Sequence, residues 1–339
     1  MFKLNVFDVS AFVYKGTTSQ NYGTRTYYGY PVGGIHYLMR YVATSLVQSD
    51  SVVLMFDGRN NFRRSVYLDY KANRVCNPAV VSQIESLWDG LSASGIPCYK
   101  RDGYEADDLI SWCVNSVKDD FSEVLIYGND KDLIHNVQSK VSFRSIAVGT
   151  NNISVANFPY SIYAGENIPF NFMSVYKVFN GCKSDNVKPF ISENGVKGRD
   201  IYQYYLDMFE KCNVPFTYQN TTNPILLTRF IDKLNLSDRD KDELKRRIKV
   251  IFPAENPGMT FDTKNVFTLK KDALRKFLTQ YNDVETLRCL EYSKYTLDEE
   301  DKDIIKKKAR DLDTGTYAVD RNLSVNNDIE SEMLYLKGF

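Results

Sequence analysis

The sequence predicts an α/β fold built on a mostly parallel central sheet. Short apolar runs that are typical of buried strands occur at residues 3–9, 51–58 and 123–133. Segments with helical periodicity separate or follow them, and these segments are 33–48, 79–94 and 105–118. Strands that alternate with helices in this way form β-α-β units, in which the strands run parallel.

Acidic residues end or follow each predicted strand. Asp8 and Asp57 end the first two, and Asp130 and Asp132 lie just past the apolar part of the third. Because the carboxyl ends of parallel strands meet at one edge of a sheet, we expect these side chains to gather on a single rim. Open α/β sheets place their functional sites there.

Three more acids, Glu105, Asp107 and Asp108, begin the predicted helix at 105–118. One at a time these acids have structural explanations, such as a favourable contact with the helix dipole worth about 0.3–1 kcal/mol. Together they would repel one another by roughly 4 kcal/mol per pair at about 4 Å and an effective dielectric of about 20. Protons or cations must therefore neutralise the cluster.

The composition restricts which cation this is. The chain has only two histidines, His36 and His135, and its six cysteines show no CxxC spacing. This disfavours a His-ligated zinc site, a disulfide framework and a Ser-His-Asp triad. Carboxylate ligands select hard ions such as Mg²⁺ and Mn²⁺, and a pair of these ions is the usual apparatus of phosphodiester hydrolysis.

A basic, aromatic segment follows the second strand. Between residues 59 and 74 it has five bases and one acid, with Phe62, Tyr67 and Tyr70 interleaved. Its bases are Arg59, Arg63, Arg64, Lys71 and Arg74. A solvated loop or exposed helix is one explanation, but phosphate contact with base stacking accounts better for the interleaving. Lys71 and Arg74 are three apart, so on a helix they would share a face.

The second half of the chain is predicted to be mostly helical. Its helical patterns cover 171–182, 199–212, 237–251 and 269–291, and Ser237 is a candidate N-cap. We divide the chain into an α/β domain at 1–160 with an arch or clamp segment at 58–78, a helical region at 161–310 and an acidic, mobile tail at 311–339. That tail ends in "MLYLKGF".

Net charge is zero, so we expect opposed acidic and basic patches rather than an evenly charged surface. No apolar run is long enough to span a membrane, and no signal peptide is evident. The scattered cysteines suit a reducing compartment. We expect a monomer in the cytoplasm, or in the host cytoplasm if the protein is viral.

Six motifs in a fixed order carry a resemblance to a known family. They are "FDV" (7–9), "FDG" (56–58), "FRR…YLDYKANR" (62–74), "YEADDLI" (104–110), "GNDKDLI" (128–134) and "NGCKSDNV" (180–187). Over roughly residues 1–210 this set resembles the 5′ nuclease superfamily. The superfamily includes flap endonucleases, the 5′-nuclease domains of bacterial DNA polymerases and the phage ribonuclease-H-type 5′ exonucleases, and the chain looks most like the last.

The resemblance implies a PIN-like α/β domain with helices on both faces of the sheet, a helical arch and a helical DNA-binding region. It also implies two Mg²⁺ ions, replaceable by Mn²⁺. The matching metal-site positions are Asp8, Asp57, Glu105, Asp107, Asp108, Asp130, Asp132 and Asp185. The positions that would act on the scissile phosphate are Tyr70, Lys71 and Arg74. Implied nucleic-acid contacts are Arg59, Arg63, Arg64, Lys183, Gly195, Lys197, Gly198 and Arg199.

The sixth motif departs from the family pattern, which has an acid where this chain has Cys182. A neutral thiol is a poor Mg²⁺ ligand, so the second metal position would depend on Asp132 and Asp185 unless the other acids suffice. Gly195 and Gly198 are three apart before a predicted helix, and this resembles the family's glycine hairpin, whose backbone contacts phosphates at a helix N-terminus. Their spacing is loose for such a hairpin, and most isolated glycine pairs only form turns.

The resulting hypothesis is a metal-dependent, structure-specific 5′→3′ nuclease with ribonuclease H-type activity, acting in replication. Its substrates would be duplex DNA, 5′ flaps and RNA primers on DNA. A non-catalytic DNA-junction-binding protein that keeps the carboxylates is an alternative, which Cys182 favours. A PIN-type ribonuclease is another, which the arch motif and the long C-terminal half disfavour. The "MLYLKGF" end is either a disordered terminus or a docking peptide for a sliding clamp or single-strand-binding protein.

Overall fold

The computed structural model describes most of the chain up to residue 291. The described residues are 3–48, 50–147, 152–154, 160–163, 166–169, 172–211, 223–254, 258–261 and 269–291. The predicted tail at 311–339, with its "MLYLKGF" end, lies outside them.

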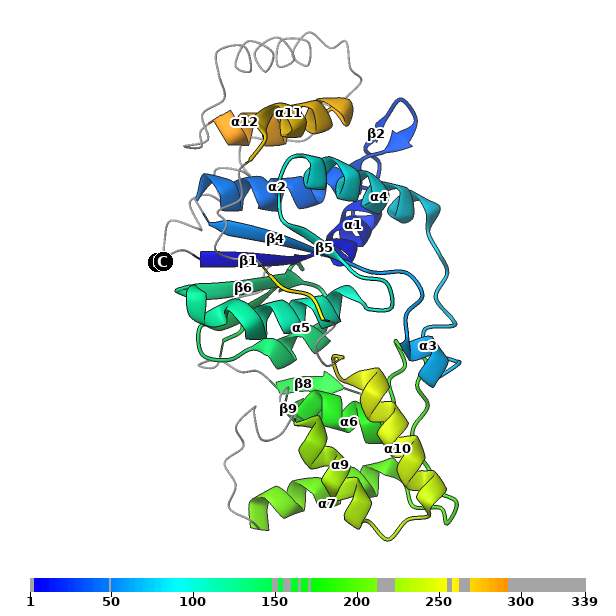
Figure 1. The fold of residues 1–339 in the computed structure, drawn as a ribbon. Helices are drawn as coiled ribbons and strands as arrows, with labels where there is room; N and C mark the ends of the chain where they lie inside the picture. Colours follow the sequence, from blue (N-terminus) through cyan, green and yellow to red (C-terminus); the bar gives the residue numbers. More distant parts are fainter. Residues whose placement is uncertain are drawn as a thin grey trace.

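A five-stranded parallel sheet forms the centre of the N-terminal half, in the order β5-β4-β1-β6-β7 (Figure 1). Its strands are β1 (Lys3–Asp8), β4 (Ser51–Phe56), β5 (Cys98–Lys100), β6 (Glu123–Gly128) and β7 (Val141–Ser145). The chain moves from β1 outward to β4 and β5, and then crosses to the other side of β1 for β6. The carboxyl end of β1 is therefore a topological switch point, where sheets of this kind place their sites.

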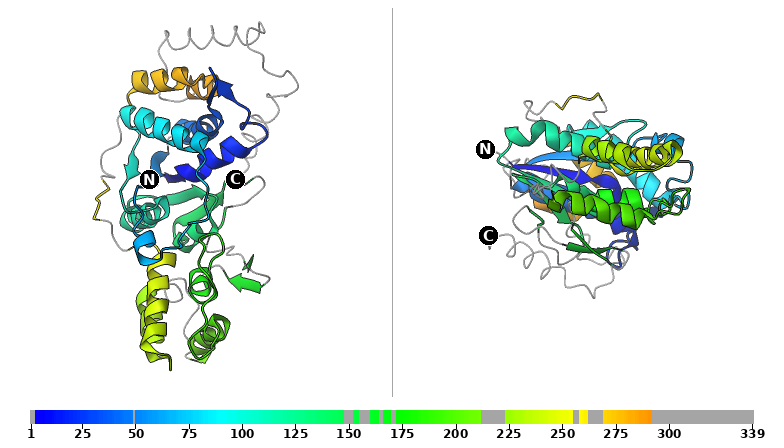
Figure 2. Two further views of the ribbon diagram at one scale, coloured as in Figure 1. Left: turned by 90° about the vertical axis from the view of Figure 1, so that its right-hand side faces the viewer. Right: turned by 90° about the horizontal axis from the view of Figure 1, so that it is seen from below.

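Helices cover both faces of this sheet (Figures 1 and 2). On one face lie α1 (Val9–Thr18), α2 (Gly33–Val47) and α4 (Pro78–Ala93), and on the other lies α5 (Ala106–Val117). Alternate residues of β1 serve the two layers, because successive strand side chains point to opposite faces. Phe7 joins the core under α1 and α2, whereas Leu4 and Val6 join the core under α5. The predicted α/β class is confirmed.

Shorter elements complete this half of the chain. A hairpin of β2 (Thr26–Tyr27) and β3 (Tyr30–Pro31) connects α1 to α2. The short helix α3 (Arg63–Val66) lies between β4 and α4. Two 3₁₀ helices, η1 (Lys118–Asp120) and η2 (Lys131–Asn136), precede and follow β6.

A second, mainly helical region lies beyond the α5 side of the sheet (Figure 1). It contains the strand pair β8 (Tyr160–Tyr163) and β9 (Glu166–Pro169), and the helices α6 (Met173–Asn180), α7 (Gly198–Lys211), α9 (Pro224–Lys233) and α10 (Asp238–Ile251). These helices share an apolar core of their own. Ser237 caps α10 as predicted, because its side chain accepts a hydrogen bond from the backbone N–H of Asp240.

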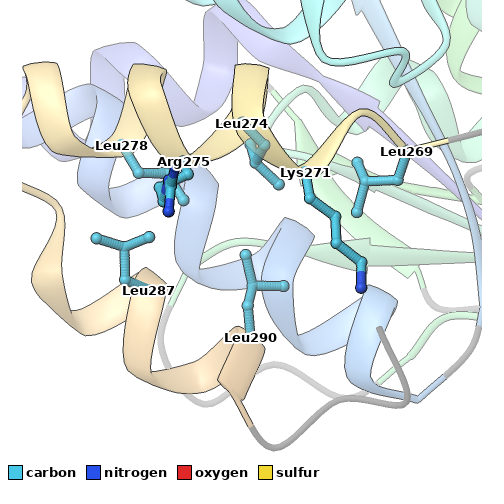
Figure 3. Close-up of a pocket in the computed structure, with 7 residues that line it drawn as sticks. All are labelled: Leu269, Lys271, Leu274, Arg275, Leu278, Leu287 and Leu290. Carbon is cyan, nitrogen blue, oxygen red and sulfur yellow. The ribbon is translucent and has the colours of Figure 1, made fainter. Parts of the chain in front are cut away.

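The final described helices return to the α/β body. α11 (Lys271–Gln280) packs on α4, and α12 (Val284–Glu291) packs on α2. Leu274 and Leu278 of α11 face Leu287 and Leu290 of α12 across a small apolar hollow (Figure 3). The range predicted as one helical region, 161–310, thus includes two helices that belong to the core of the sheet domain.

The single helix predicted at 269–291 is divided into these two. Asn282 has a left-handed backbone (φ 54°), which interrupts the helix. Asp283 then accepts a hydrogen bond from the backbone N–H of Thr286 and begins α12. Within the described parts of the chain, no helix has the length and apolar character needed to cross a bilayer.

Candidate metal and nucleic-acid site

Asp8 and Asp57 lie side by side at the switch point of the sheet. Asp8 ends β1 and caps α1, where its Oδ1 accepts a hydrogen bond from the backbone N–H of Ala11 at 3.2 Å. Asp57 follows β4 directly, and its Oδ1 accepts from the backbone N–H of Ala106 at the start of α5 (2.9 Å). Its other oxygen accepts from Ser10 of α1. Two carboxylates from neighbouring strands thus fix the starts of two helices.

Asp107 and Asp130 complete this group, which we call the switch-point cluster (Asp8, Asp57, Asp107 and Asp130). Burial and the charge of Asp57 raise the pKa of Asp8 to about 7. Burial, with Asp130 and Asp8 as charged neighbours, raises the pKa of Asp107 well above its ordinary value. The pKa of Asp130 is raised by burial and by Asp132. These shifts indicate negative charge that the described residues do not neutralise.

The switch-point cluster suits a hydrated divalent ion. The Asp107 carboxylate accepts no hydrogen bond from any described residue, and none of the four carboxylates forms an ion pair within the same part of the chain. No three His, Cys, Asp or Glu side chains in the described ranges converge closely enough to enclose a metal ion directly. Mg²⁺ commonly keeps several waters and takes only one or two carboxylates, so an ion bridged by water fits these residues.

Glu105 has a different environment, because it is held by the basic segment. Lys71 Nζ donates to its Oε1 at 2.6 Å, and the Tyr70 hydroxyl donates to its Oε2 at 2.9 Å. Although burial acts to lower the pKa of Lys71, the charges of Glu105 and Asp185 raise it, so the ammonium is retained. Burial and Glu105 likewise raise the pKa of Tyr70, so its hydroxyl stays a donor.

Asp185 is the next carboxylate along the rim. Its Oδ1 accepts from an Nη2 hydrogen of Arg74 at 3.2 Å and lies 3.9 Å from Lys71 Nζ. Its Oδ2 accepts from the Sγ of Cys182 at 3.1 Å. The sequence brings Cys182 and Asp185 together in a tight turn, in which the two backbone hydrogen bonds between Cys182 and Val187 close the loop.

Asp132 is paired with a residue that sequence reasoning missed. The Lys177 ammonium, on α6, donates to both carboxylate oxygens of Asp132. Burial acts to lower the pKa of Lys177, but Asp132 and Cys182 raise it above its ordinary value. The available signal was one lysine inside the otherwise apolar helix "MSVYKVFN". A buried lysine requires a partner of opposite charge.

Asp108 turns away from the rim. It is fully buried, and its two oxygens accept from Nη1 and Nη2 of Arg63 at 2.7 and 2.6 Å. It also accepts from the backbone N–H groups of Glu105 and Ala254. Burial acts to raise the pKa of Asp108, but Arg63 lowers it below its ordinary value. Every acceptor direction is therefore used inside the protein, and in this geometry Asp108 has none left for a metal ion.

The family comparison agrees with the motif order. Residues 3–159 match the model of the 5′-3′ exonuclease N-terminal, resolvase-like domain. This part of the chain, a little under half of it, is therefore similar to that domain. The chain is 27% identical over 325 residues to DNA polymerase I of Caldicellulosiruptor bescii, and the matched region covers 90% of this chain and 33% of that protein. It is also 32% identical over 143 residues to the 5′-3′ exonuclease of Aquifex aeolicus, which covers 41% of this chain and 49% of that protein.

The chain thus spans a third of the length of the first relative and about half of the second, and it spans 66% of the 5′-3′ exonuclease of Buchnera aphidicola. Among solved structures it is similar to zinc-bound T5 5′-exonuclease, with 17% identity, a TM-score of 0.48, and coverage of 90% of this chain and 98% of that one. It is also similar to flap endonuclease-1 from Methanococcus jannaschii, with 14% identity, a TM-score of 0.48, and coverage of 91% and 93%.

The predicted arch segment differs from the expectation of a helical arch. Within 58–78, all of which is described, only α3 is a helix, and turns make up much of the rest. Lys71 and Arg74 do not share a helical face, because Lys71 has a left-handed backbone (φ 52°) and its N–H donates to the backbone oxygen of Asp185. Both side chains still reach Asp185, through the turn rather than through a helix.

The predicted nucleic-acid contacts separate into two groups. Arg63 is buried, and besides Asp108 it donates to the backbone oxygens of Val250 and Phe252 at the end of α10, so it is not free to contact DNA. Gly198 is also buried, since a Cβ there would lie 2.0 Å from the backbone oxygen of Phe179. The remaining predicted contacts lie at exposed or partly exposed surface: Arg59, Arg64, Lys183, Gly195, Lys197 and Arg199.

Proposed function

We propose that this chain is a divalent-metal-dependent, structure-specific 5′→3′ nuclease. Its substrates would be duplex DNA with free 5′ ends, 5′ flaps and RNA primers annealed to DNA, so its activity includes cleavage of the ribonuclease H type during replication. Because the chain matches only part of the length of its relatives, its activity, substrates and partners are proposals in their own right.

One observation carries the proposal: a group of carboxylates without ion pairs among the described residues lies beside a group of basic side chains. Three members of the switch-point cluster, Asp8, Asp107 and Asp130, have raised pKa values. Next to this cluster, Lys71 and Arg74 are joined to the same rim through Glu105 and Asp185. Acids that attract cations and bases that attract phosphate are both required for metal-assisted phosphodiester hydrolysis.

The residues divide the work by chemistry. Asp8, Asp57, Asp107 and Asp130 would hold Mg²⁺, which Mn²⁺ would replace, as one ion or as one of a pair. Bound there, the metal would supply charge neutralisation at the phosphate and activation of the attacking water. We assign no metal contact to Asp108, whose acceptor positions are all used within the protein.

The basic residues would orient the phosphate. The Arg74 side chain is half exposed, so its guanidinium has room for a phosphate in addition to Asp185. Lys71 is mostly buried and is held by Glu105, so its charge has a fixed position before the substrate arrives. A cation that is already positioned costs no reorganisation when negative charge develops on the phosphate. Tyr70 keeps Glu105 in place as a hydrogen-bond donor.

The remaining surfaces would supply binding. We propose that the mainly helical region after residue 160 contacts duplex DNA through the turn at Gly195 and the exposed bases Lys183, Lys197 and Arg199. We further propose that the protein acts as a monomer, and that residues 333–339 at the end of the tail dock on a sliding clamp or single-strand-binding protein. Deletion of residues 330–339 should then abolish stimulation by such a partner while leaving basal cleavage intact.

The decisive experiment uses 5′-labelled flap DNA and an RNA-primed duplex with the full chain. We expect labelled product with Mg²⁺ or Mn²⁺, no product with EDTA, and loss of at least 100-fold in rate for Asp130→Asn. Asp119→Asn is the matched control, because Asp119 is exposed in η1 before β6, near the amino ends of the strands and away from the carboxylate rim. Cleavage that persists in EDTA would contradict the proposal.

The same assay tests the alternative, a DNA-junction-binding protein without catalysis. Its motivating observation is Cys182, which is buried and donates to Asp185 where the family has an acid. That alternative predicts retention of flap DNA in a gel-shift experiment together with no cleavage under any divalent ion.

A further inference from the structure

The two ends of the carboxylate rim are electrostatically unlike. At one end the four carboxylates of the switch-point cluster have no ion pair among the described residues. At the other end, Asp132 is paired with Lys177 and Asp185 with Arg74. Two carboxylates there face two cations of the same chain, so the formal charge at that end is zero.

Lys177 is built into this position. Its side chain is 6% exposed and comes from the centre of α6, whose neighbouring residues pack into the core of the helical region. Its ammonium contacts both oxygens of Asp132, so it lies in the same direction from that carboxylate as an approaching cation would. Separating a buried ammonium from its carboxylate costs the pairing energy without restoring solvation, so the contact is strongly favoured in the free protein.

Cys182 adds to the imbalance. Its thiol donates to Asp185 Oδ2, while Asp185 Oδ1 is used by Arg74. A divalent ion at this end would therefore meet one thiol in place of a carboxylate, and two carboxylates whose oxygens already have donors. It would also lie close to the Lys177 ammonium, which repels it.

We propose that Lys177 is a built-in monovalent cation that occupies the Asp132–Asp185 end of the rim. The free protein then binds one divalent ion, at the switch-point cluster. A second divalent ion binds only when Lys177 leaves Asp132. The proposal depends on the function proposed above, since it assumes that the switch-point cluster binds the first ion. Under this proposal, the two metal positions differ in affinity because of the positive charge of Lys177.

The test is a count of bound ions without nucleic acid. Mn²⁺ is titrated into the full chain, and the free ion is followed by its electron paramagnetic resonance signal. We expect one tightly bound ion in the wild type and a second, bound at least 10-fold more weakly. In Lys177→Met the second ion should bind at least 10-fold more tightly than in the wild type, whereas Lys177→Arg should keep the wild-type pattern.

Three further variants support the interpretation of this result. Lys177→Gln removes the charge but can still donate a hydrogen bond to Asp132, so it tests the same point if Lys177→Met does not fold. Lys233→Met is the matched control, because Lys233 is an exposed lysine at the end of α9, and its pattern should be unchanged. Cys182→Asp, which restores a carboxylate, should also tighten the second ion.

Two tight ions in the wild type, or no change in Lys177→Met and Lys177→Gln, would overturn the proposal while leaving the proposed nuclease function standing. A wild-type protein that binds no Mn²⁺ at all would instead overturn both, and Asp8→Asn would then have no effect on the titration.

Discussion

Replacement of Arg63 by methionine should strongly destabilise the protein, although Arg63 lies in a segment whose composition suggests DNA binding. The Arg63 side chain is 4% exposed and donates to both oxygens of Asp108. It also donates to the backbone oxygens of Val250 and Phe252. It therefore connects α3, the start of α5 and the end of α10.

The magnitude follows from what the substitution leaves behind. In Arg63→Met the Asp108 carboxylate stays completely buried and keeps only its two backbone N–H donors. Breaking one side of a buried ion pair costs about 3–5 kcal/mol, because the remaining charge is desolvated and uncompensated. We expect the free energy of unfolding to fall by about that amount, with no need for a lost DNA contact.

Urea denaturation followed by circular dichroism at pH 7 measures this. Arg64→Met is the matched control, because Arg64 is the exposed neighbour in the same helix, and its effect should be within about 0.5 kcal/mol. The double variant Arg63→Met/Asp108→Leu should recover part of the loss, since no buried charge remains. Equal, small effects for Arg63→Met and Arg64→Met would refute the structural role of Arg63.

Three further outcomes are expected. Without divalent ions, the free energy of unfolding should fall as pH rises from about 4 to about 7. The pKa of Asp8 is raised from 3.8 to about 7, so the folded state binds more protons than the unfolded state in that window. In urea titrations Asp8→Asn should remove much of this dependence, which reaches up to about 4 kcal/mol at pH 8 at roughly 1.4 kcal/mol per pKa unit. Gly198→Ala should lower the free energy of unfolding by about 1–3 kcal/mol, because the added Cβ would meet a backbone oxygen at 2.0 Å. The neighbouring variant Lys197→Ala should leave the melting temperature unchanged and weaken DNA binding measured by fluorescence anisotropy. Arg74→Gln should lower the cleavage rate about 10- to 100-fold while changing stability by less than about 1 kcal/mol, since its ion pair is half exposed; a large loss of stability would show that its role is structural.

The layout of the rim could be predicted because it depends on local order in the chain. Asp8 and Asp57 follow apolar strands, and parallel strands bring their carboxyl ends to one edge regardless of what else the chain does. The helix start at Ala106 could be predicted for the same reason, since an acidic first turn before an apolar stripe is a local signal.

The partners of the acids could not be predicted in this way. Arg63 and Asp108 are 45 residues apart, as are Lys177 and Asp132, and no periodicity or spacing relates them. Likewise, the face shared by Lys71 and Arg74 was inferred from a helix that does not form. A backbone hydrogen bond from Lys71 to the distant Asp185 favours the turn instead.

The sequence by itself determined that carboxylates would gather at the switch point of a parallel sheet beside a basic segment. Only the tertiary structure decided which of those carboxylates have no ion pair among the described residues. Burial forces a charge to be paired, and the pairing depends on which oppositely charged side chain the packing brings within reach. Arg63 thus takes Asp108 and Lys177 takes Asp132, while Asp8, Asp107 and Asp130 keep the uncompensated charge that a metal ion would neutralise.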